Sequence, residues 1–92
     1  MRVPKSISNL EYCKQVVRSS GSIGANYIEA NDSLGKKDFL MRIKICRKEA
    51  KETRYWLKSI SCEDSDSVKQ GALVRESTGL MNIFGAILRN SV

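Results

Sequence analysis

The 92-residue sequence contains no histidine, a single proline and no long run of apolar residues. Without histidine, the chain lacks the side chain most often used for acid–base catalysis and for metal binding. No apolar stretch approaches the roughly 18 residues needed to span a bilayer. The polar N-terminus also lacks the apolar core of a signal peptide. We therefore expect a cytoplasmic protein with no membrane partner.

Sequence motifs for catalysis and phosphate binding are missing as well. There is no G-x-x-x-x-G-K-[ST] or G-x-G-x-x-G loop, and Gly21–Gly24 lacks the preceding strand and the lysine that a phosphate loop needs. Cys13, Cys46 and Cys62 are widely spaced and form no C-x-x-C pair, which favours reduced, buried thiols. We predict that the protein is not an enzyme and has no metal, cofactor or small-molecule substrate.

Helical periodicity dominates the chain. Polar connectors separate the periodic segments and are short enough to make neighbouring helices antiparallel. Ser19–Ser22 are poor helix formers, but the apolar phase continues across them, and we interpret the first segment as one helix. The pattern predicts an all-α, antiparallel up-and-down helical bundle in a single domain over residues 1–92. The expected helices cover residues 4–31, 34–61 and 67–90.

Local signals refine these helices. Ser33 is the expected N-cap of the second helix, and Ser67 with Gln70 has the pattern of a capping box for the third. The third helix also contains glycines, which weaken it, so it must rely on packing against its neighbours. These glycines are Gly71, Gly79 and Gly85.

The basic charge is concentrated on the second segment. Between Lys36 and Lys58 there are nine basic and three acidic residues. Their net charge of +6 equals that of the whole chain. On a wheel of about 100° per residue, all of these cations except Arg42 fall within an arc of about 120°. We call these eight residues the basic stripe. They are Lys36, Lys37, Lys44, Arg47, Lys48, Lys51, Arg54 and Lys58.

A charged helix face can simply be solvated, but such faces normally mix signs. The basic stripe is nearly pure in sign, and Leu40 and Tyr55 lie within it, offering apolar and stacking contacts. A phosphate backbone is the natural partner of such a surface. We predict binding of nucleic acid, with RNA favoured. The alternative is a protein-interaction or accessory module whose basic face docks an acidic protein.

The acids of the second segment have a different interpretation. Glu49 and Glu52 share one helix face at a spacing also found in carboxylate metal sites. Such sites need a second pair and usually histidines, so we interpret both glutamates as salt-bridge or buried-network residues. Asp38 and Arg42 are four residues apart and are expected to pair.

Two sequence blocks resemble a known family. Gln15–Ala30 resembles the pattern Q-x-x-R-S-x-x-S-I-G-A-N-Y-x-E-A, and Asp38-Phe39 followed by Lys48–Leu57 resembles D-F…K-E-A-x-E-T-x-Y-W-L. These patterns are typical of the four-helix-bundle family encoded within intervening sequences of 23S ribosomal RNA genes, to which accessory proteins of diversity-generating retroelements are related. The resemblance implies an antiparallel bundle, commonly a ring-like homopentamer with basic surfaces, and no known enzymatic activity.

The resemblance also implies structural roles for the signature positions, whose polar members are expected to form a hydrogen-bond network between helices. These positions are Ser22, Asn26, Glu29, Glu49, Glu52, Tyr55 and Trp56. Family members normally carry a further helix before the point where this chain starts, so the chain supplies three helices of the expected four. Three helices alone would expose an apolar face, which favours self-association into a homo-oligomer.

Overall fold

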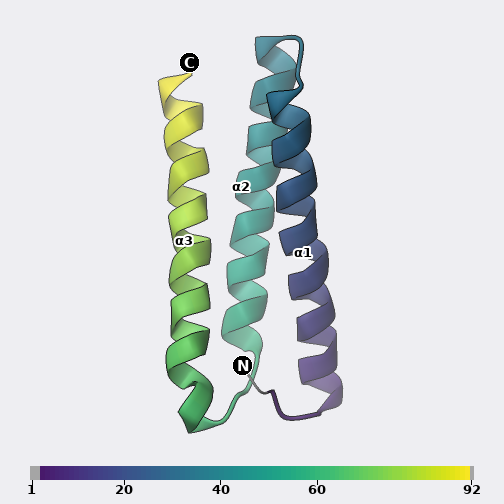
Figure 1. Cartoon of the computed structure of the whole chain (residues 1–92), viewed down its shortest axis with the longest axis vertical. Coiled ribbons are helices and arrows are strands. Elements are labelled where there is room, and N and C mark those ends of the chain that lie inside the picture. The colour runs from purple at the N-terminus through teal and green to yellow at the C-terminus, as the bar shows by residue number, and fades with distance from the viewer. Residues whose placement is uncertain (1–2, 92) are drawn as a thin grey trace.

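A computed structural model describes residues 3–91 of the chain and contains three long helices. These are α1 (Ile7–Asn31), α2 (Lys36–Ser59) and α3 (Ser67–Asn90), with a short 3₁₀ turn, η1 (Asp64–Asp66), before α3. Consecutive helices run antiparallel, and α2 lies between α1 and α3 (Figure 1). This arrangement confirms the predicted all-α antiparallel fold. Among the described residues, no helix is both long and apolar enough to cross a membrane.

Side-chain hydrogen bonds set the helix ends, and two of the expected caps are wrong. α1 begins at Ile7 rather than near residue 4, because the Ser6 hydroxyl caps it by accepting from the Asn9 N–H at 3.0 Å. The N-cap of α2 is Gly35, while the Ser33 hydroxyl donates instead to the Glu29 carbonyl in the last turn of α1, at 3.0 Å. The Ser33 hydroxyl therefore binds the end of α1 rather than capping the start of α2.

The capping box expected at the start of α3 does not form either. The Gln70 amide donates to the carbonyls of Leu57 and Ile60 at 2.8 and 2.6 Å, so it binds the end of α2. α2 ends at Ser59, two residues earlier than expected, because Ile60 is extended with its carbonyl held by Gln70. Gln70 thus fixes the turn between α2 and α3 rather than the first turn of α3.

α1 is continuous through the serine-rich stretch, as predicted, and the packing explains why. The fully buried Ser19 hydroxyl bonds to the Gln15 carbonyl one turn earlier, at 2.8 Å. It also lies 2.7 Å from the Thr53 hydroxyl of α2, which itself bonds the Glu49 carbonyl at 2.8 Å. Small hydroxyl side chains let the two backbones approach closely, while the buried Ser19 and Thr53 hydroxyls both keep hydrogen-bond partners.

α2 is the central element of the core. Its Ile43, Cys46 and Ala50 are buried against Ala30 of α1 and Phe84 of α3. No Cα atoms of α1 and α3 come within 8 Å of each other in the described chain, so these two helices meet only through side chains. An open groove of about 480 Å³ consequently separates them; its floor includes Thr53 and Leu57 of α2.

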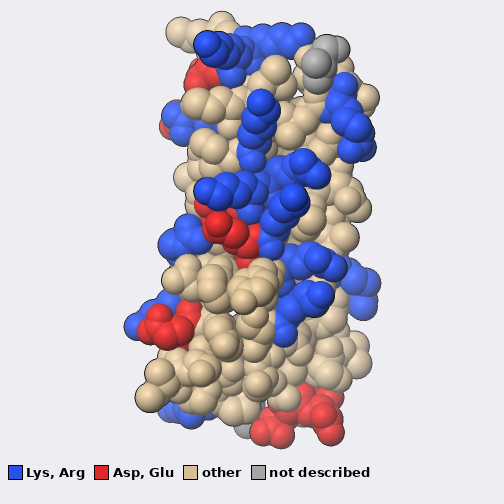
Figure 2. Space-filling view, turned by 180° about the vertical axis from the view of Figure 1, so that it is seen from behind, with Lys and Arg blue, Asp and Glu red and all other residues tan. Residues whose placement is uncertain are grey.

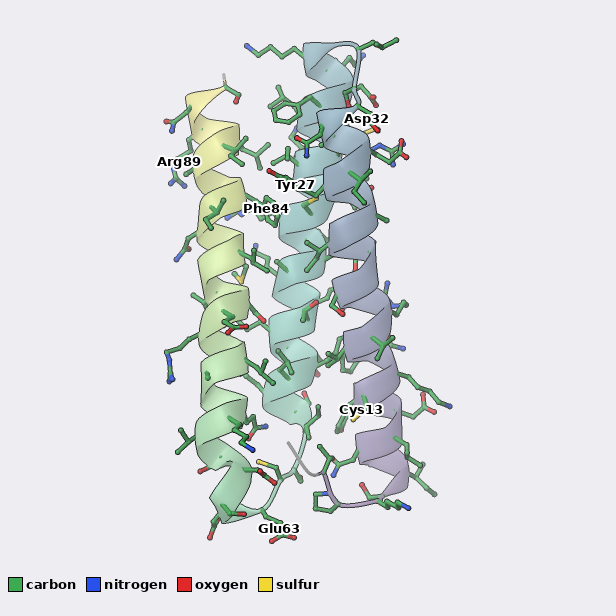
Figure 3. The ribbon with its side chains drawn as sticks, viewed as in Figure 1. Cys13, Tyr27, Asp32, Glu63, Phe84 and Arg89 are labelled. Carbon is green, nitrogen blue, oxygen red and sulfur yellow. The ribbon has the colours of Figure 1, made fainter. Side chains whose placement is uncertain are left out.

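One long side-chain contact does join α1 to α3. The rings of Tyr27 and Phe84 point toward each other with centroids 6.2 Å apart, edge to face (Figure 3). At the opposite end of the molecule, the buried Asn9 amide group ties the start of α1 to the turn after α2. It donates to the carbonyls of Pro4 and Ser61 and accepts from the Ser61 N–H, all within 3.0 Å. Side-chain contacts therefore connect neighbouring segments at both ends of the bundle.

Candidate nucleic-acid interface

The basic stripe runs along the side of α2 that faces away from the core. Lysine and arginine side chains form a nearly continuous band down the middle of this face, with acidic side chains at only a few places (Figure 2). All of the stripe residues are exposed except Arg54, which is half-buried. Over Lys36–Lys58 the helix rises about 33 Å, long enough to contact several successive phosphates.

The stripe cations have no acidic partners. Among residues 3–91, none of the eight forms an ion pair or a side-chain hydrogen bond with another part of the protein. The Nε atom of Arg54 is buried without a partner. Eight unpaired positive charges along one helix repel each other, which is unfavourable unless an anion from outside compensates them.

An aromatic group lies within the stripe. The Tyr55 side chain is 62% exposed, and its ring packs edge to face against Trp56 at a centroid distance of 4.9 Å. Trp56 in turn stacks on Tyr12 of α1, at 5.9 Å. This support on one side leaves the other side of Tyr55 open for stacking on an unpaired base. Leu40, the second apolar residue of the arc, is half-buried.

Two acids of α2, Glu49 and Glu52, are paired with an arginine of α1. Arg18 of α1 donates to Glu52 at 2.8 Å and to Glu49 at 3.4 Å. The hydrogen bond to Glu52, together with the charge of Glu49, raises the pKa of the Arg18 guanidinium above its ordinary value. Both glutamates are therefore engaged in ion pairs between helices, as interpreted from the sequence.

The expected Asp38–Arg42 pair is wrong. Arg42 is half-buried and donates instead to the side-chain oxygen of Asn26 on α1, at 3.1 Å. Asn26 also donates to the Ser22 carbonyl within its own helix at 2.9 Å. Arg42 therefore joins the α1–α2 interface, which explains why it falls outside the basic stripe.

The signature positions do not form one network. Asn26, Glu49 and Glu52 make contacts between helices, whereas Ser22 bonds only within α1, to Asn26. The exposed Glu29 carboxylate has no polar partner among residues 3–91. Tyr55 and Trp56 belong to the aromatic stack. In the part of the chain that is described, no group of three or more His, Cys, Asp or Glu residues could hold a metal ion.

Two cations outside the second segment were missed by the sequence prediction. Arg75 and Arg89 of α3 each fold back over a glycine one turn earlier, Gly71 and Gly85, in a repeated G-x-x-x-R pattern. The two arginines are fourteen residues apart, which places them on the same side of α3. The repeat could have been found in the sequence, but the approach of Arg89 to Arg47 of the stripe depends on how α3 packs against α2.

A shallow hollow of about 330 Å³ lies beside the stripe. Its lining residues are Lys44, Arg47, Lys48, Lys51 and Leu88, so four of the five carry a positive charge. The structure thus gathers half of the stripe around one depression that α2 and α3 share.

The comparison with known families identifies the chain. The model of the 23S rRNA-intervening sequence protein family matches residues 2–76. The chain belongs to this family. The match includes all of α1, α2 and the basic stripe, whereas Gly85 and Arg89 lie beyond it. No curated protein and no solved structure matches this 23S rRNA-intervening sequence protein.

Proposed function

We propose that this 23S rRNA-intervening sequence protein is a non-enzymatic nucleic-acid-binding protein that holds RNA along the basic stripe. The observation that carries the proposal is that none of the eight stripe cations forms an ion pair among residues 3–91, whereas Glu49 and Glu52 of the same helix are paired with Arg18. When these cations neutralise phosphates, the counterions condensed on the nucleic acid are released, and this release drives association.

Two further features favour a nucleic acid over an acidic protein. The stripe extends along α2 from Lys36 to Lys58, which suits a backbone that carries a charge at every nucleotide. Tyr55 stands exposed beside the stripe and is braced from behind by Trp56. Stacking on an aromatic ring is available to every base and needs no particular sequence. The proposal is therefore binding with little sequence preference.

The test is charge reversal on the stripe. Changing Lys44, Arg47, Lys51 and Arg54 to Glu removes four phosphate contacts and adds repulsion, so affinity for a labelled single-stranded RNA should fall at least about a hundredfold. The matched control changes Lys5, Lys14, Lys69 and Arg75 to Glu, with the same change in net charge away from the stripe. Equal affinities of the two variants would overturn the proposal. Stronger binding to polyglutamate than to RNA would point to the acidic protein partner.

We also propose that the protein self-associates, with a second copy of the chain covering the groove between α1 and α3. Apolar side chains on the rims of the groove are incompletely covered, including Leu73 and Leu80, which are 37% and 38% exposed. Exposed apolar residues continue along both helices at Val17 and Ile83. A chain with a net charge of +6 associates most easily through a face that keeps the basic stripes apart, and this face lies away from the stripe.

Light scattering coupled to size exclusion tests this second proposal. Leu80→Gln makes the groove polar and should shift the protein toward monomer at a given concentration. Leu34→Gln is the control, because Leu34 is fully exposed in the turn between α1 and α2 and lies outside the groove. A monomeric wild-type protein, or equal masses for the two variants, would contradict the proposal.

A further inference from the structure

The arginines nearest to Gly85 come from two different helices. A Cβ atom added at Gly85 would lie 3.4 Å from Nη1 of Arg89 and 3.6 Å from Nε of Arg47. Arg47 belongs to α2 and Arg89 to α3, so the two side chains approach one point at the α2–α3 interface. Their nitrogens are no further apart than the sum of these distances, about 7 Å.

This separation suits one phosphate group. Each nitrogen donates to a phosphate oxygen at about 2.8 Å, and the oxygens lie on opposite sides of the phosphorus atom. Two guanidinium groups up to about 7 Å apart can therefore hold the same phosphate from two sides. Arginine is suited to this role because its planar group can donate two parallel hydrogen bonds.

The surroundings of the pair favour an anion from outside. Neither Arg47 nor Arg89 has an acidic partner among the described residues. Arg47 also lines the hollow that Lys44, Lys48 and Lys51 share, so further positive charge lies on one side of the pair. Arg89 extends along the side of α3 that faces away from α1, leaving its guanidinium accessible (Figure 3).

We propose that Arg47 and Arg89 together form a binding site for a single backbone phosphate of the bound RNA strand. The inference rests on the proposed RNA-binding function and adds α3 to an interface that otherwise belongs to α2. Because stripe cations continue on both sides of Arg47, from Lys36 to Lys58, the strand runs through the site. The ligand is thus an internal phosphodiester. Holding one phosphate from two helices would fix the position of the strand along the stripe.

Gly85 lies at the point where the two arginine side chains come together. A Cβ atom there would make ordinary van der Waals contacts with Nη1 of Arg89 and Nε of Arg47. Gly71 and Arg75 repeat the pattern one segment earlier on α3, but only Arg75 lies within 4 Å of a Cβ added at Gly71. Arg75 therefore lies over a glycine of α3 as Arg89 does, but no arginine of α2 lies beside that glycine.

The test compares Arg89→Gln with Arg75→Gln, using a labelled single-stranded RNA of about 20 nucleotides. Arg89→Gln should weaken binding about five- to tenfold, because a charge-assisted contact to phosphate is lost. Arg75→Gln should change affinity less than about twofold. Both variants change the same net charge on an exposed side of α3, and their thermal unfolding should match.

A double-mutant cycle then examines whether Arg47 and Arg89 share one phosphate. If they do, Arg47→Gln combined with Arg89→Gln should cost less than the product of the single effects. The slope of log Kobs against log[salt] should fall by about one contact, not two. Arg47→Gln combined with Arg75→Gln should show independent effects.

The outcomes separate this site from the general function. Equal effects of Arg89→Gln and Arg75→Gln, in a protein whose binding still depends on the stripe, would overturn the two-arginine site alone. Independent effects in the Arg47–Arg89 cycle would overturn it as well. A wild-type protein with no salt-sensitive RNA binding would overturn both the site and the proposed function.

Discussion

Along the α1–α2 interface, the Arg18 guanidinium reaches two carboxylates of α2, at 2.8 and 3.4 Å. Along the α2–α3 interface, the Arg47 guanidinium reaches Gly85 and approaches a second arginine, with no ion pair among the described residues. Both arginines cross from one helix to the next, but only the first finds an opposite charge. Charges at the α1–α2 interface are thus paired within the chain, whereas those of the stripe remain available to a partner.

The two interfaces also differ in what holds them together. Between α1 and α2, the buried Ser19 and Thr53 hydroxyls and the Asn26–Arg42 bond supply specific polar contacts. Between α2 and α3, the buried contact is mainly apolar and centres on Phe84, with Leu88 packed against it. The α1–α2 interface therefore depends on specific hydrogen bonds, and the α2–α3 interface depends on close packing of apolar side chains. The following predictions test this difference.

The largest effect is expected at Phe84, where the apolar contact is concentrated. Phe84→Ala should lower the free energy of unfolding by about 3–5 kcal/mol, because it leaves a cavity and removes the edge-to-face contact with Tyr27. In so small a protein this change can prevent folding, so Phe84→Leu, with an expected loss of about 1–2 kcal/mol, is the companion variant. Urea denaturation measures both. A loss below about 0.5 kcal/mol for Phe84→Leu would show that α3 is not held by this packing.

The next effect tests the polar α1–α2 interface. Thr53→Val keeps the shape of the side chain but removes the hydroxyl shared with Ser19, and should cost about 1–2 kcal/mol in urea denaturation. Thr78→Val is the control, since the Thr78 hydroxyl bonds only the Val74 carbonyl of its own helix. If both changes cost the same, the contact between helices adds nothing to stability.

A pH effect is expected from Cys46, which lies at the centre of α2. Burial raises the pKa of the Cys46 thiol above its ordinary value. The folded protein therefore keeps the proton at pH values where the unfolded chain releases it, and stability falls as pH rises through that range. The slope is at most about 1.4 kcal/mol per pH unit. The stability advantage of wild type over Cys46→Ala should accordingly shrink above about pH 8.5.

Cys62→Ala provides the reference for this experiment, because Cys62 is only half-buried. The titrating groups other than Cys46 and Cys62 are the same in all three proteins and cancel in the comparison. A constant difference between wild type and Cys46→Ala from pH 7 to 10 would contradict the expected raised pKa.

The smallest effect on stability is expected on the stripe itself. Lys44→Gln should change the free energy of unfolding by less than about 0.5 kcal/mol, since the ammonium group has no partner to lose. Arg18→Gln should lower stability, because it leaves Glu49 and Glu52 without their partner. Thermal unfolding of the two variants side by side measures the contrast. Equal losses would remove the distinction between paired and available charges.

Much of the fold could be predicted from patterns within single helices. Periodicity gave the three helices, and the helical wheel gave the basic stripe and placed Arg42 outside it. The wrong predictions concern residues whose choice depends on another helix. Ser33 and Gln70 had good local capping patterns, yet the Ser33 hydroxyl binds the last turn of α1 and the Gln70 amide binds the end of α2. Local pattern alone could not decide between these partners.

The same limit applies to the candidate site. Arg18 lies 31 and 34 residues from the glutamates it binds, and these pairs depend on the register between α1 and α2. Arg89 meets Arg47 only because α3 packs with Gly85 against α2. A helical wheel drawn for one helix does not show how α1 or α3 is aligned along α2. The sequence therefore predicted the charges of the stripe but not the helix that completes it.

The salt dependence of RNA binding tests the central claim most directly, because it counts the charges that are available to a partner. For a single-stranded RNA, each neutralised phosphate contributes about −0.7 to the slope of log Kobs against log[salt]. We predict a slope of about −3 or steeper for wild type, and a slope near zero when Lys44, Arg47, Lys51 and Arg54 are changed to Glu. A shallow slope for wild type, or the same slope in that variant, would contradict the account.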